Sequence, residues 1–108
     1  MTLQQKLESL VSAYTAITPK VYHYLRPKLV PPFIVWQEDG ENGFDAGNIK
    51  AEQAITGSTD YFTQQEFDPI IDQIQTAHNN LGIPWTLNSV QYEDETNLIH
   101  YEWRWEVF

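Results

Sequence analysis

The last ten residues of the chain, 99–108, alternate between apolar and polar side chains. The apolar positions are Ile99, Tyr101, Trp103, Trp105 and Val107, and the residues between them are His100, Glu102, Arg104 and Glu106. Successive side chains of a β-strand point to opposite faces of its sheet, whereas a helix turns by about 100° per residue and would scatter these positions around its axis. The pattern therefore predicts a strand with one apolar face and one charged face, onto which the rest of the chain packs.

Two other segments repeat apolar residues at helical spacing. The first opens with the capping box Thr2–Gln5 and stops before Pro19, and its apolar positions are Leu3, Leu7, Leu10, Val11, Tyr14 and Ile17. The second is expected to have Asp68 as N-cap, Pro69 at its first helical position and Gly82 in the left-handed conformation just after its end. Its stripe contains Phe67, Ile70, Ile71, Ile74, Ala77, His78 and Leu81, with His78 interpreted as a residue at the boundary of the core.

Four further segments are predicted strands: 21–25, 33–38, 50–62 and 85–92. The run Phe33-Ile-Val-Trp36 is apolar at every position, as expected for a central strand. Gly57 lies in the middle of segment 50–62 and indicates a bulge or a close approach of the backbone. Segment 39–47 contains three glycines and several acidic residues, so we predict a flexible loop there, and a turn at 94–97.

The resulting order of elements is α-β-β-β-α-β-β. Two helices that each have one apolar face, together with strands joined mainly by short turns, predict an α+β fold. We expect a two-layer sandwich in which both helices lie on one face of a mostly antiparallel sheet of four or five strands. Residues 1–108 are expected to form a single domain.

The composition excludes several classes of protein. The 108 residues contain no Cys, so neither a disulfide framework nor a thiolate metal site is expected, and an intracellular origin is the simpler interpretation. No apolar run reaches the roughly 20 residues of a membrane span, and the first residues do not resemble a secretory signal. The formal net charge of −9 opposes binding to nucleic-acid phosphates. We therefore expect a protein that binds neither a membrane nor a specific nucleic-acid sequence.

No pattern of catalytic residues stands out. The three histidines are spread along the chain without metal-binding spacing, and no serine lies in a nucleophile motif. The segment beginning at Asp39 lacks the required ligands at the fifth and twelfth positions of a calcium loop. We therefore predict a protein that is not an enzyme and has no catalytic residue, cofactor or metal. The surplus of aromatic residues, among them Trp36, Trp85 and Tyr92, instead favours a binding or assembly protein, because exposed aromatic residues mark interfaces.

Three segments carry a resemblance to a known family. They are Pro32-Phe-Ile-Val-Trp36, Gly57-Ser-Thr-Asp-Tyr-Phe-Thr63 and Glu66-Phe-Asp-Pro-Ile-Ile-Asp-Gln-Ile74. Placed between an amphipathic first helix and a closing strand hairpin, they resemble the small tail-terminator (tail-completion) and head–tail joining proteins of long-tailed phages and their prophages. The resemblance covers nearly the whole chain, as a pattern of elements rather than a signature motif.

This resemblance implies a virion protein that assembles with copies of itself into a ring, typically a hexamer, and requires no cofactor. The ring would cap the tail tube and dock to head-connector proteins, so the chain would be cytoplasmic during assembly and then part of the virion tail. The candidate lining of the ring lumen, or contact with a neighbour, is the acidic loop with Asp39, Glu41, Asn42 and Asp45. The candidate subunit interfaces are the polar side of the first helix and the long strand, with Glu52, Gln53, Ile55 and Thr59.

Two other classes stay open. A small acidic protein can inhibit a basic or nucleic-acid-binding host protein by carboxylate mimicry, in a one-to-one complex without a ring. That mechanism needs a row of carboxylates at phosphate-like intervals, which Glu93, Asp94, Glu95, Glu102 and Glu106 would supply only in part. A small-molecule binding module lined by Trp and Tyr would require a pocket.

Overall fold

The computed structural model describes residues 1–28, 30–46 and 49–108, with the side chains of residues 43–52 left out. Within this part of the chain there are two helices and five strands, in the order expected from the sequence. Their bounds are α1 Leu3–Ile17, β1 Val21–His23, β2 Phe33–Ala46, β3 Ile49–Thr63, α2 Ile70–Asn80, β4 Trp85–Glu93 and β5 Leu98–Val107.

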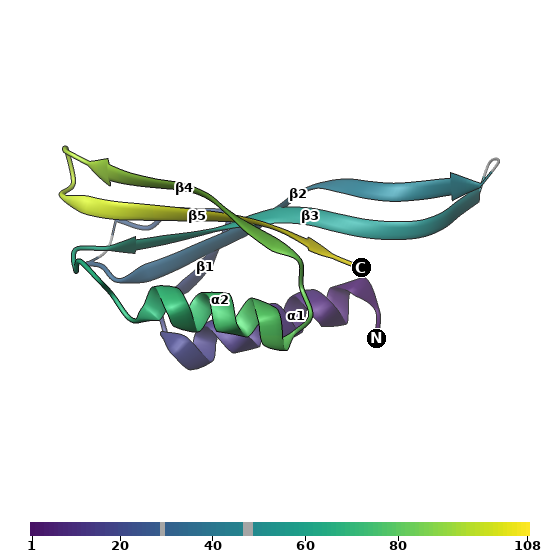
Figure 1. The fold of residues 1–108 in the computed structure, drawn as a ribbon, viewed down its shortest axis with the longest axis horizontal. Helices are drawn as coiled ribbons and strands as arrows, with labels where there is room; N and C mark the ends of the chain where they lie inside the picture. Colours follow the sequence, from purple (N-terminus) through teal and green to yellow (C-terminus); the bar gives the residue numbers. More distant parts are fainter. Residues whose placement is uncertain (29, 47–48) are drawn as a thin grey trace.

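The strands form one sheet in the order β1-β2-β3-β5-β4. The β1 strand runs parallel to β2, and the other neighbouring pairs are antiparallel. Figure 1 shows α1 and α2 side by side on one face of this sheet, with the β2–β3 hairpin projecting beyond them. The fold is therefore the predicted two-layer α+β arrangement, and β1 and β4 are the two edges of its sheet.

The first helix begins with the predicted capping box. The Gln5 amide donates to Thr2 Oγ1 over 3.1 Å, and the Thr2 amide donates to Gln5 Oε1 over 2.9 Å, so two amides that lack helical partners are satisfied. Its apolar stripe contacts the sheet through Leu10 and Tyr14, which are both fully buried. The Thr18 amide closes the helix on the carbonyl of Tyr14, one residue before Pro19.

The second helix begins at Ile70, with Pro69 in the N-cap position, one residue later than predicted. Asp68 nevertheless supplies the capping carboxylate, because its Oδ1 accepts from the Ile70 amide over 2.9 Å. Its Oδ2 accepts from the hydroxyls of Tyr61 and Thr63 over 2.6 and 2.8 Å, which fastens the helix to the end of β3. After the helix, the predicted left-handed conformation is present at Gly82, with φ of +68°.

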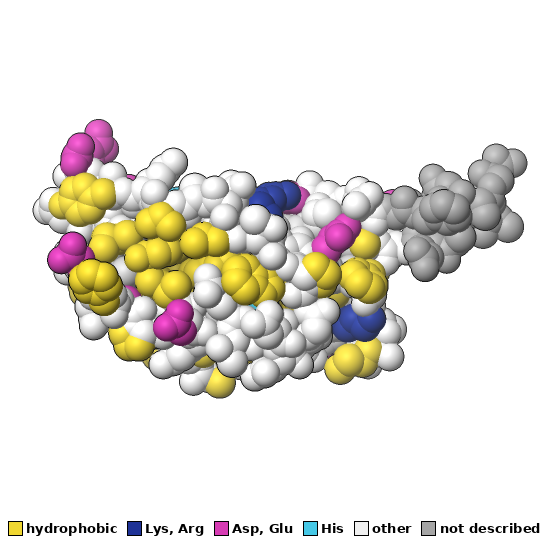
Figure 2. Space-filling view, in the orientation of Figure 1, with side chains coloured by type: hydrophobic (Ala, Val, Ile, Leu, Met, Phe, Trp, Pro, Cys, Tyr) yellow, Lys and Arg dark blue, Asp and Glu magenta, His cyan; other side chains and the backbone are white. Residues whose placement is uncertain are grey.

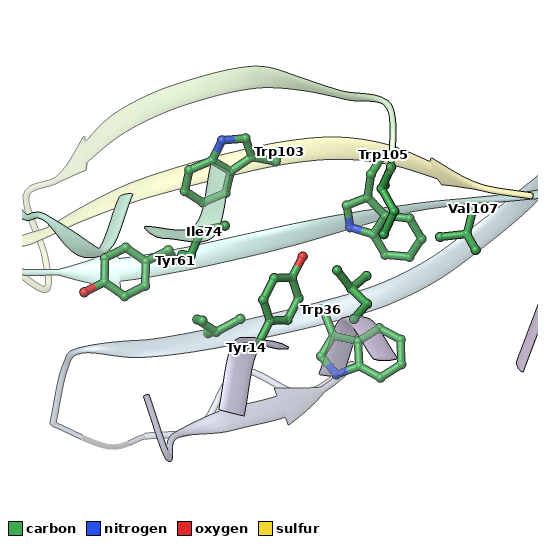
Figure 3. Close-up of a cluster of buried hydrophobic side chains, with 10 residues drawn as sticks. Tyr14, Trp36, Tyr61, Ile74, Trp103, Trp105 and Val107 are labelled. Atoms are coloured by element: carbon green, nitrogen blue, oxygen red, sulfur yellow. The ribbon is translucent and has the colours of Figure 1, made fainter. Parts of the chain in front are cut away.

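The main core lies between the helices and the sheet (Figure 3). Trp103 and Trp105 of β5 point into it and are 0% and 3% exposed, as the alternation of the last strand predicts. Glu102, Arg104 and Glu106 accordingly lie on the opposite, outer face of the sheet. Each fully buried large apolar side chain contributes about 1.5–3 kcal/mol relative to an exposed one, so this cluster is the main source of stability.

A chain of polar groups crosses this core. Trp105 Nε1 donates to Thr59 Oγ1 over 2.8 Å, the Thr59 hydroxyl bonds to the Tyr14 hydroxyl over 2.7 Å, and Tyr14 bonds to His78 Nε2 over 2.6 Å. His78 is 0% exposed, so its predicted position at the core boundary is wrong. The Tyr14 hydroxyl makes its burial tolerable by giving the ring a hydrogen-bond partner inside the core. Burial also lowers the pKa of His78 to about 4, which keeps the ring neutral.

Gly57 marks a close approach of the backbone, as predicted. A Cβ atom at this position would lie 2.4 Å from the Gln37 carbonyl oxygen and 2.4 Å from the Trp105 ring. The register of the β2–β3 ladder shifts between Glu38 and Gly40, next to the residue that pairs with Gly57. A bulge in β2 and a residue without a side chain in β3 therefore occur together where the two strands pass the indole of Trp105.

The predicted flexible loop at 39–47 is wrong for residues 39–46, which form the second half of β2. They pair with β3 as far as Ala46 opposite Ile49, with a second register shift between Phe44 and Asp45. Glycine is tolerated here because the antiparallel ladder is made by backbone groups, so a regular partner strand can order a glycine-rich one. The last residue of the predicted loop, Gly47, lies outside the described residues.

Candidate assembly surfaces

The β2–β3 hairpin is longer than the sheet that supports it. The β5 strand pairs with β3 only from Ile55 to Thr63, whereas β2 and β3 pair with each other to the end of the hairpin. Asn42–Ala46 and Ile49–Ala54 therefore have only each other as neighbours in the ladder, and we call this two-stranded segment the arm. It projects to one side of the molecule in Figure 1 and contributes to the long axis of the 50 × 25 × 21 Å particle.

Asp39 lies at the base of the arm and is held by two residues. The Arg104 guanidinium donates to both of its carboxylate oxygens, and Thr56 Oγ1 donates to Oδ1 over 3.0 Å. The hydrogen bonds from Arg104 lower the pKa of the Asp39 carboxyl below its usual value. Asp39 therefore anchors β2 to β5 on the outer face of the sheet, a structural role that its place in an acidic segment does not indicate.

The other candidate lumen residues lie further along β2. Glu41 accepts a hydrogen bond from Gln53 Nε2 of β3 over 2.5 Å, and Asn42 Nδ2 donates to Glu106 Oε1 over 2.9 Å. Asp45 pairs with Lys50 in the backbone ladder, and its side chain is outside the described part of the chain. The structure thus brings Asp39, Glu41 and Asn42 together at the root of the arm rather than on a loop.

The four candidate interface residues of the long strand have different surroundings. Glu52 pairs with Phe44 in the arm, and its side chain is not among those described. Gln53 is exposed and Ile55 half-buried, at the point where the arm leaves the sheet. Thr59 is fully buried and bonded to Tyr14 and Trp105, so it is a core residue and does not present a surface to a neighbour. Residues Ile55–Thr63 pair with β2 on one side and with β5 on the other, so this part of β3 has no free edge.

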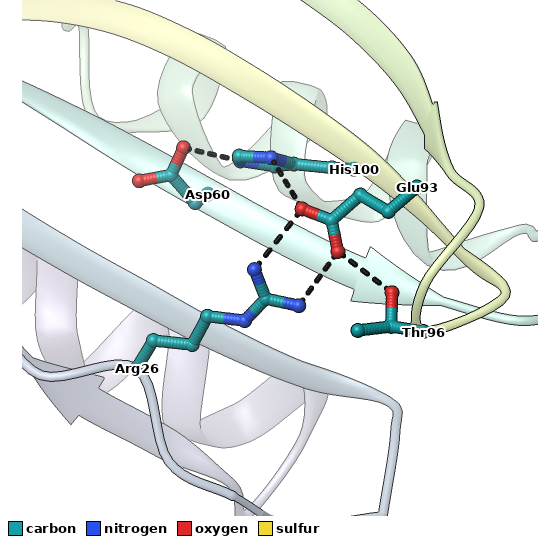
Figure 4. Close-up of polar contacts among 5 residues, drawn as sticks. All are labelled: Arg26, Asp60, Glu93, Thr96 and His100. Atoms are coloured by element: carbon teal, nitrogen blue, oxygen red, sulfur yellow. Dashed lines mark hydrogen bonds and ion pairs between the residues drawn. The ribbon is translucent and has the colours of Figure 1, made fainter.

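The outer face of the sheet carries a polar cluster that the sequence does not reveal (Figure 4). Arg26, from the loop after β1, donates to both oxygens of Glu93 over 3.0 and 2.6 Å and lies 4.2 Å above the Phe62 ring. His100 Nε2 lies 2.7 Å from Asp60 Oδ1, with Nδ1 3.6 Å from Glu93 Oε2. Hydrogen bonding from Arg26 lowers the pKa of Glu93. The cluster therefore fixes the loop after β1 across the outer face.

A surface on the helix side of the sheet, along the edge strand β4, remains uncovered. Trp85, Leu87, Val90 and Tyr92 pair with Trp105, Trp103, Tyr101 and Ile99, so their side chains share the face that the helices cover. The helices do not reach the far end of β4, and the exposure rises from 39% at Leu87 to 51% at Val90 and 60% at Tyr92. Figure 2 shows hydrophobic side chains gathered on this side of the molecule.

A register shift hides this surface from sequence analysis. The ladder of β4 and β5 shifts between Leu87 and Ser89, at Asn88. Strict alternation from Trp85 would place Ser89 and Gln91 beside Leu87, whereas the extra residue brings Val90 and Tyr92 to that face instead. The only sign of this surface in the sequence is therefore the excess of aromatic residues. Of the three that were singled out, Tyr92 is exposed, Trp85 is half-buried and Trp36 is buried in the core.

The described residues contain no group of three or more His, Asp or Glu side chains arranged to hold a metal ion. Among the same residues, no helix is both long and apolar enough to cross a membrane. The polar clusters found here link strands and loops through hydrogen bonds and ion pairs.

Comparison with known proteins supports the fold. No protein-family model and no curated protein match the sequence. A chain from the virion of a native gene transfer agent particle is similar in structure, with a TM-score of 0.55 and 10% identity over 97% of this chain and 89% of that one. Structures of H-NOX proteins, one from a study of H-NOX activation and one of a Cs H-NOX mutant, have TM-scores of 0.51 and 10% identity. They match 99% of this chain, which spans about half (49%) of theirs.

Proposed function

We propose that this protein is a structural component of a phage or prophage virion, of the tail-terminator or head–tail joining type. In this role it assembles as a ring of identical subunits, six by analogy with the family it resembles, caps the tail tube and docks to the head connector. The observation that carries the proposal is the likeness to a gene transfer agent virion chain, which extends over almost the full length of both chains. At 10% identity this likeness concerns the fold, and the role rests on it together with the resemblance in sequence.

Two features of the molecule agree with an assembly role. Its sheet has two open edges. One of them is β4, a strand of nine residues whose outer edge no other strand pairs with. Its arm extends beyond the sheet by about 17 Å, taking five residues at roughly 3.3 Å each. A two-stranded ribbon of this kind buries little by itself, so a neighbouring subunit or the tail tube is a reasonable binding partner for it.

The arm can be removed without disturbing the sheet. Asn42 and Ala54 are direct partners in the β2–β3 ladder, so residues 43–53 can be replaced by Asn-Gly, which forms the tight turn of a two-residue hairpin. We expect the shortened protein to keep its secondary structure and melting temperature but to lose ring formation or tube capping. Light scattering after size exclusion measures the mass, and electron microscopy of tail tubes with added protein measures capping. Gln73→Ala, which keeps the arm and changes an exposed position of α2, is the matched control.

A wild-type particle of defined mass that caps tubes supports the proposal, and a protein that stays monomeric and never alters tube length contradicts it. The acidic lumen is tested separately with Glu41→Lys and Asp45→Lys. Asp39 is left unchanged because its reversal would place a lysine against Arg104. Unimpaired head–tail joining by this double variant would rule out an acidic lumen at the arm while leaving the terminator role intact.

The alternative of an acidic inhibitor is less well supported, because three of the five carboxylates in its row already have partners. Glu93 is bound by Arg26, Glu102 accepts from Asn88 Nδ2 over 2.6 Å, and Glu106 accepts from Asn42. A carboxylate that mimics phosphate must be free to receive a basic partner. A strict monomer that forms a one-to-one complex with a basic protein would nevertheless favour this alternative.

A further inference from the structure

We propose that Asn42 is a site of spontaneous deamidation and that its conversion to an acid loosens the arm. The chain has asparagine at positions 42, 48, 79, 80, 88 and 97, and Asn42 is the one that glycine follows. Because glycine has no Cβ, the backbone nitrogen of Gly43 is unhindered, and the chain can bend there toward the asparagine side chain. The inference concerns the isolated chain, so it stands independently of the proposed ring.

The reaction consumes water and needs no oxidant or reductant. After the Gly43 amide loses its proton to the solvent, its nitrogen attacks Cγ of Asn42. A new C–N bond forms, and the Cγ–Nδ2 bond breaks to release ammonia. Water then opens the cyclic imide. Opening at Cγ gives aspartate, whereas opening at the main-chain carbonyl carbon gives isoaspartate, whose backbone runs through Cβ and Cγ.

Opening of the arm makes this reaction possible. Pairing holds Asn42 opposite Ala54 and Gly43 opposite Gln53 in an extended ladder, which restrains the nitrogen from approaching the side chain. The arm projects beyond the helices and the rest of the sheet (Figure 1), and a two-stranded ribbon without such support is marginally stable in water. Each opening frees the backbone at 42–43 to bend, and Asn42 is exposed to water even in the closed arm.

The side chain of Asn42 lies where an amide is favourable and an acid is not. Its Nδ2 donates to Glu106 Oε1 over 2.9 Å, which links the root of the arm to β5. An ionised carboxylate at position 42 has no proton to donate and would face a second carboxylate. Arg104 lines the same groove, but its guanidinium already binds both oxygens of Asp39. Deamidation therefore replaces an attractive contact with a repulsive one.

Isoaspartate would disturb the arm further, because it adds one methylene to the backbone of β2. The register of the β2–β3 ladder already shifts on both sides of this position, between Glu38 and Gly40 and between Phe44 and Asp45. With a longer backbone at position 42, the pairs beyond it cannot all keep their hydrogen bonds and their side-chain directions. The arm of an ageing chain should thus lose its order while the body keeps its core.

Ageing of the isolated protein at mildly alkaline pH tests the first step. We would digest samples at intervals and follow each asparagine by mass spectrometry, with electron-transfer fragmentation to distinguish aspartate from isoaspartate. Asn88 is the internal control: it is also exposed and its Nδ2 also donates to a carboxylate of β5, that of Glu102, over 2.6 Å, but serine follows it. We expect Asn42 to convert at least tenfold faster than Asn88.

The effect on the arm is measured on the converted protein, which ion exchange separates because it carries an additional negative charge. Hydrogen exchange of its arm amides should be at least fivefold faster than in fresh protein, with Tyr61 and Trp103 unchanged. Asn42→Gln is the matched control, because its side chain keeps the amide but closes a larger, less favoured ring. Aged samples of this variant should retain the exchange of fresh ones. Asn42→Asp supplies the acid without the methylene, so its arm should exchange faster than the wild type but slower than the isoaspartate fraction.

Two results would overturn the proposal. Conversion of Asn42 no faster than that of Asn88 would show that the paired arm prevents the ring closure. Equal hydrogen exchange in fresh and fully converted protein would show that the contact with Glu106 and the regular backbone of β2 do not order the arm.

Discussion

His78 lies in the core with Nε2 bonded to the Tyr14 hydroxyl and with Nδ1 lacking a hydrogen-bond partner among the described residues. His78 therefore makes only one of the two hydrogen bonds that its ring nitrogens could form. Protonation would place a charge beside Trp85 and Trp103, whose rings surround the imidazole. The cost of that charge is the reason that burial lowers the pKa of His78 to about 4.

This pKa predicts a loss of stability in mild acid. An unfolded histidine has a pKa near 6.5, so between pH 6.5 and 4 the unfolded chain binds a proton that the folded protein does not. The stabilising contribution is complete above pH 6.5 and declines as the pH falls toward 4. From pH 7 to pH 5 we expect this residue alone to reduce the free energy of unfolding by about 2 kcal/mol. Urea denaturation of the wild type and His78→Gln at both pH values measures it, and an equal loss in the two proteins would contradict the assignment.

Gly57 gives a second prediction at the residue scale. Gly57→Ala would place a methyl group within 2.4 Å of the Gln37 carbonyl and the Trp105 ring, both of which are held by the sheet and core. We expect the free energy of unfolding to fall by about 2–3 kcal/mol, as for other overpacked sites. Gly40→Ala is the matched control, because its Cβ would meet only Thr56 Oγ1 at 3.2 Å. Similar stabilities of the two variants in chemical denaturation would show that β3 can move away from Trp105.

At the scale of elements, Asp68 joins the end of β3 to the start of α2. Its carboxylate accepts from two hydroxyls and one helix amide, and the residue is only 6% exposed. Asp68→Ala would leave these three donors without their partner, so we expect a loss of about 2–4 kcal/mol in the free energy of unfolding. Gln73→Ala, at an exposed position of the same helix, should change it by less than about 0.5 kcal/mol. Thermal unfolding with both variants tests whether this junction is as important as its geometry suggests.

The sequence predicts most elements because their patterns arise from local rules. The helices follow from apolar spacing and caps, and β5 follows from its alternation. The second half of β2 could not be recognised, because its order comes from pairing with β3 and not from its own residues, of which Gly40 and Gly43 favour a loop. The buried state of His78 likewise depends on Tyr14, 64 residues away in the chain.

The candidate surfaces are harder to predict than the fold, for a related reason. Asp39 belongs to an acidic segment, yet its partner Arg104 is 65 residues away and becomes visible only when β2, β3 and β5 are aligned. Val90 joins Leu87 on one face through a bulge that has no signature in the sequence. Surfaces defined by tertiary pairing therefore require coordinates, whereas the excess of aromatic residues alone indicates that some such surface exists.

At the scale of the whole molecule, the body and the arm differ in what supports them. In the body, β3 has a strand on each side and a face covered by helices, whereas the arm strands have only each other. A two-stranded ribbon without such support is marginally stable in water. Opening of the arm should therefore cost much less free energy than global unfolding, because no core residue becomes exposed.

Hydrogen exchange can measure this difference and relate it to assembly. In the isolated protein, we expect the amides of Asn42 and Ala54 to exchange at least a hundredfold faster than those of Tyr61 and Trp103, which lie in the supported part of the sheet. If the arm binds a neighbouring subunit or a tail tube, its amides should become protected on assembly, because the partner prevents opening. Equal exchange of arm and body in the isolated protein would show that the arm is stable without a partner, and exchange unchanged by assembly would remove the arm from the interface.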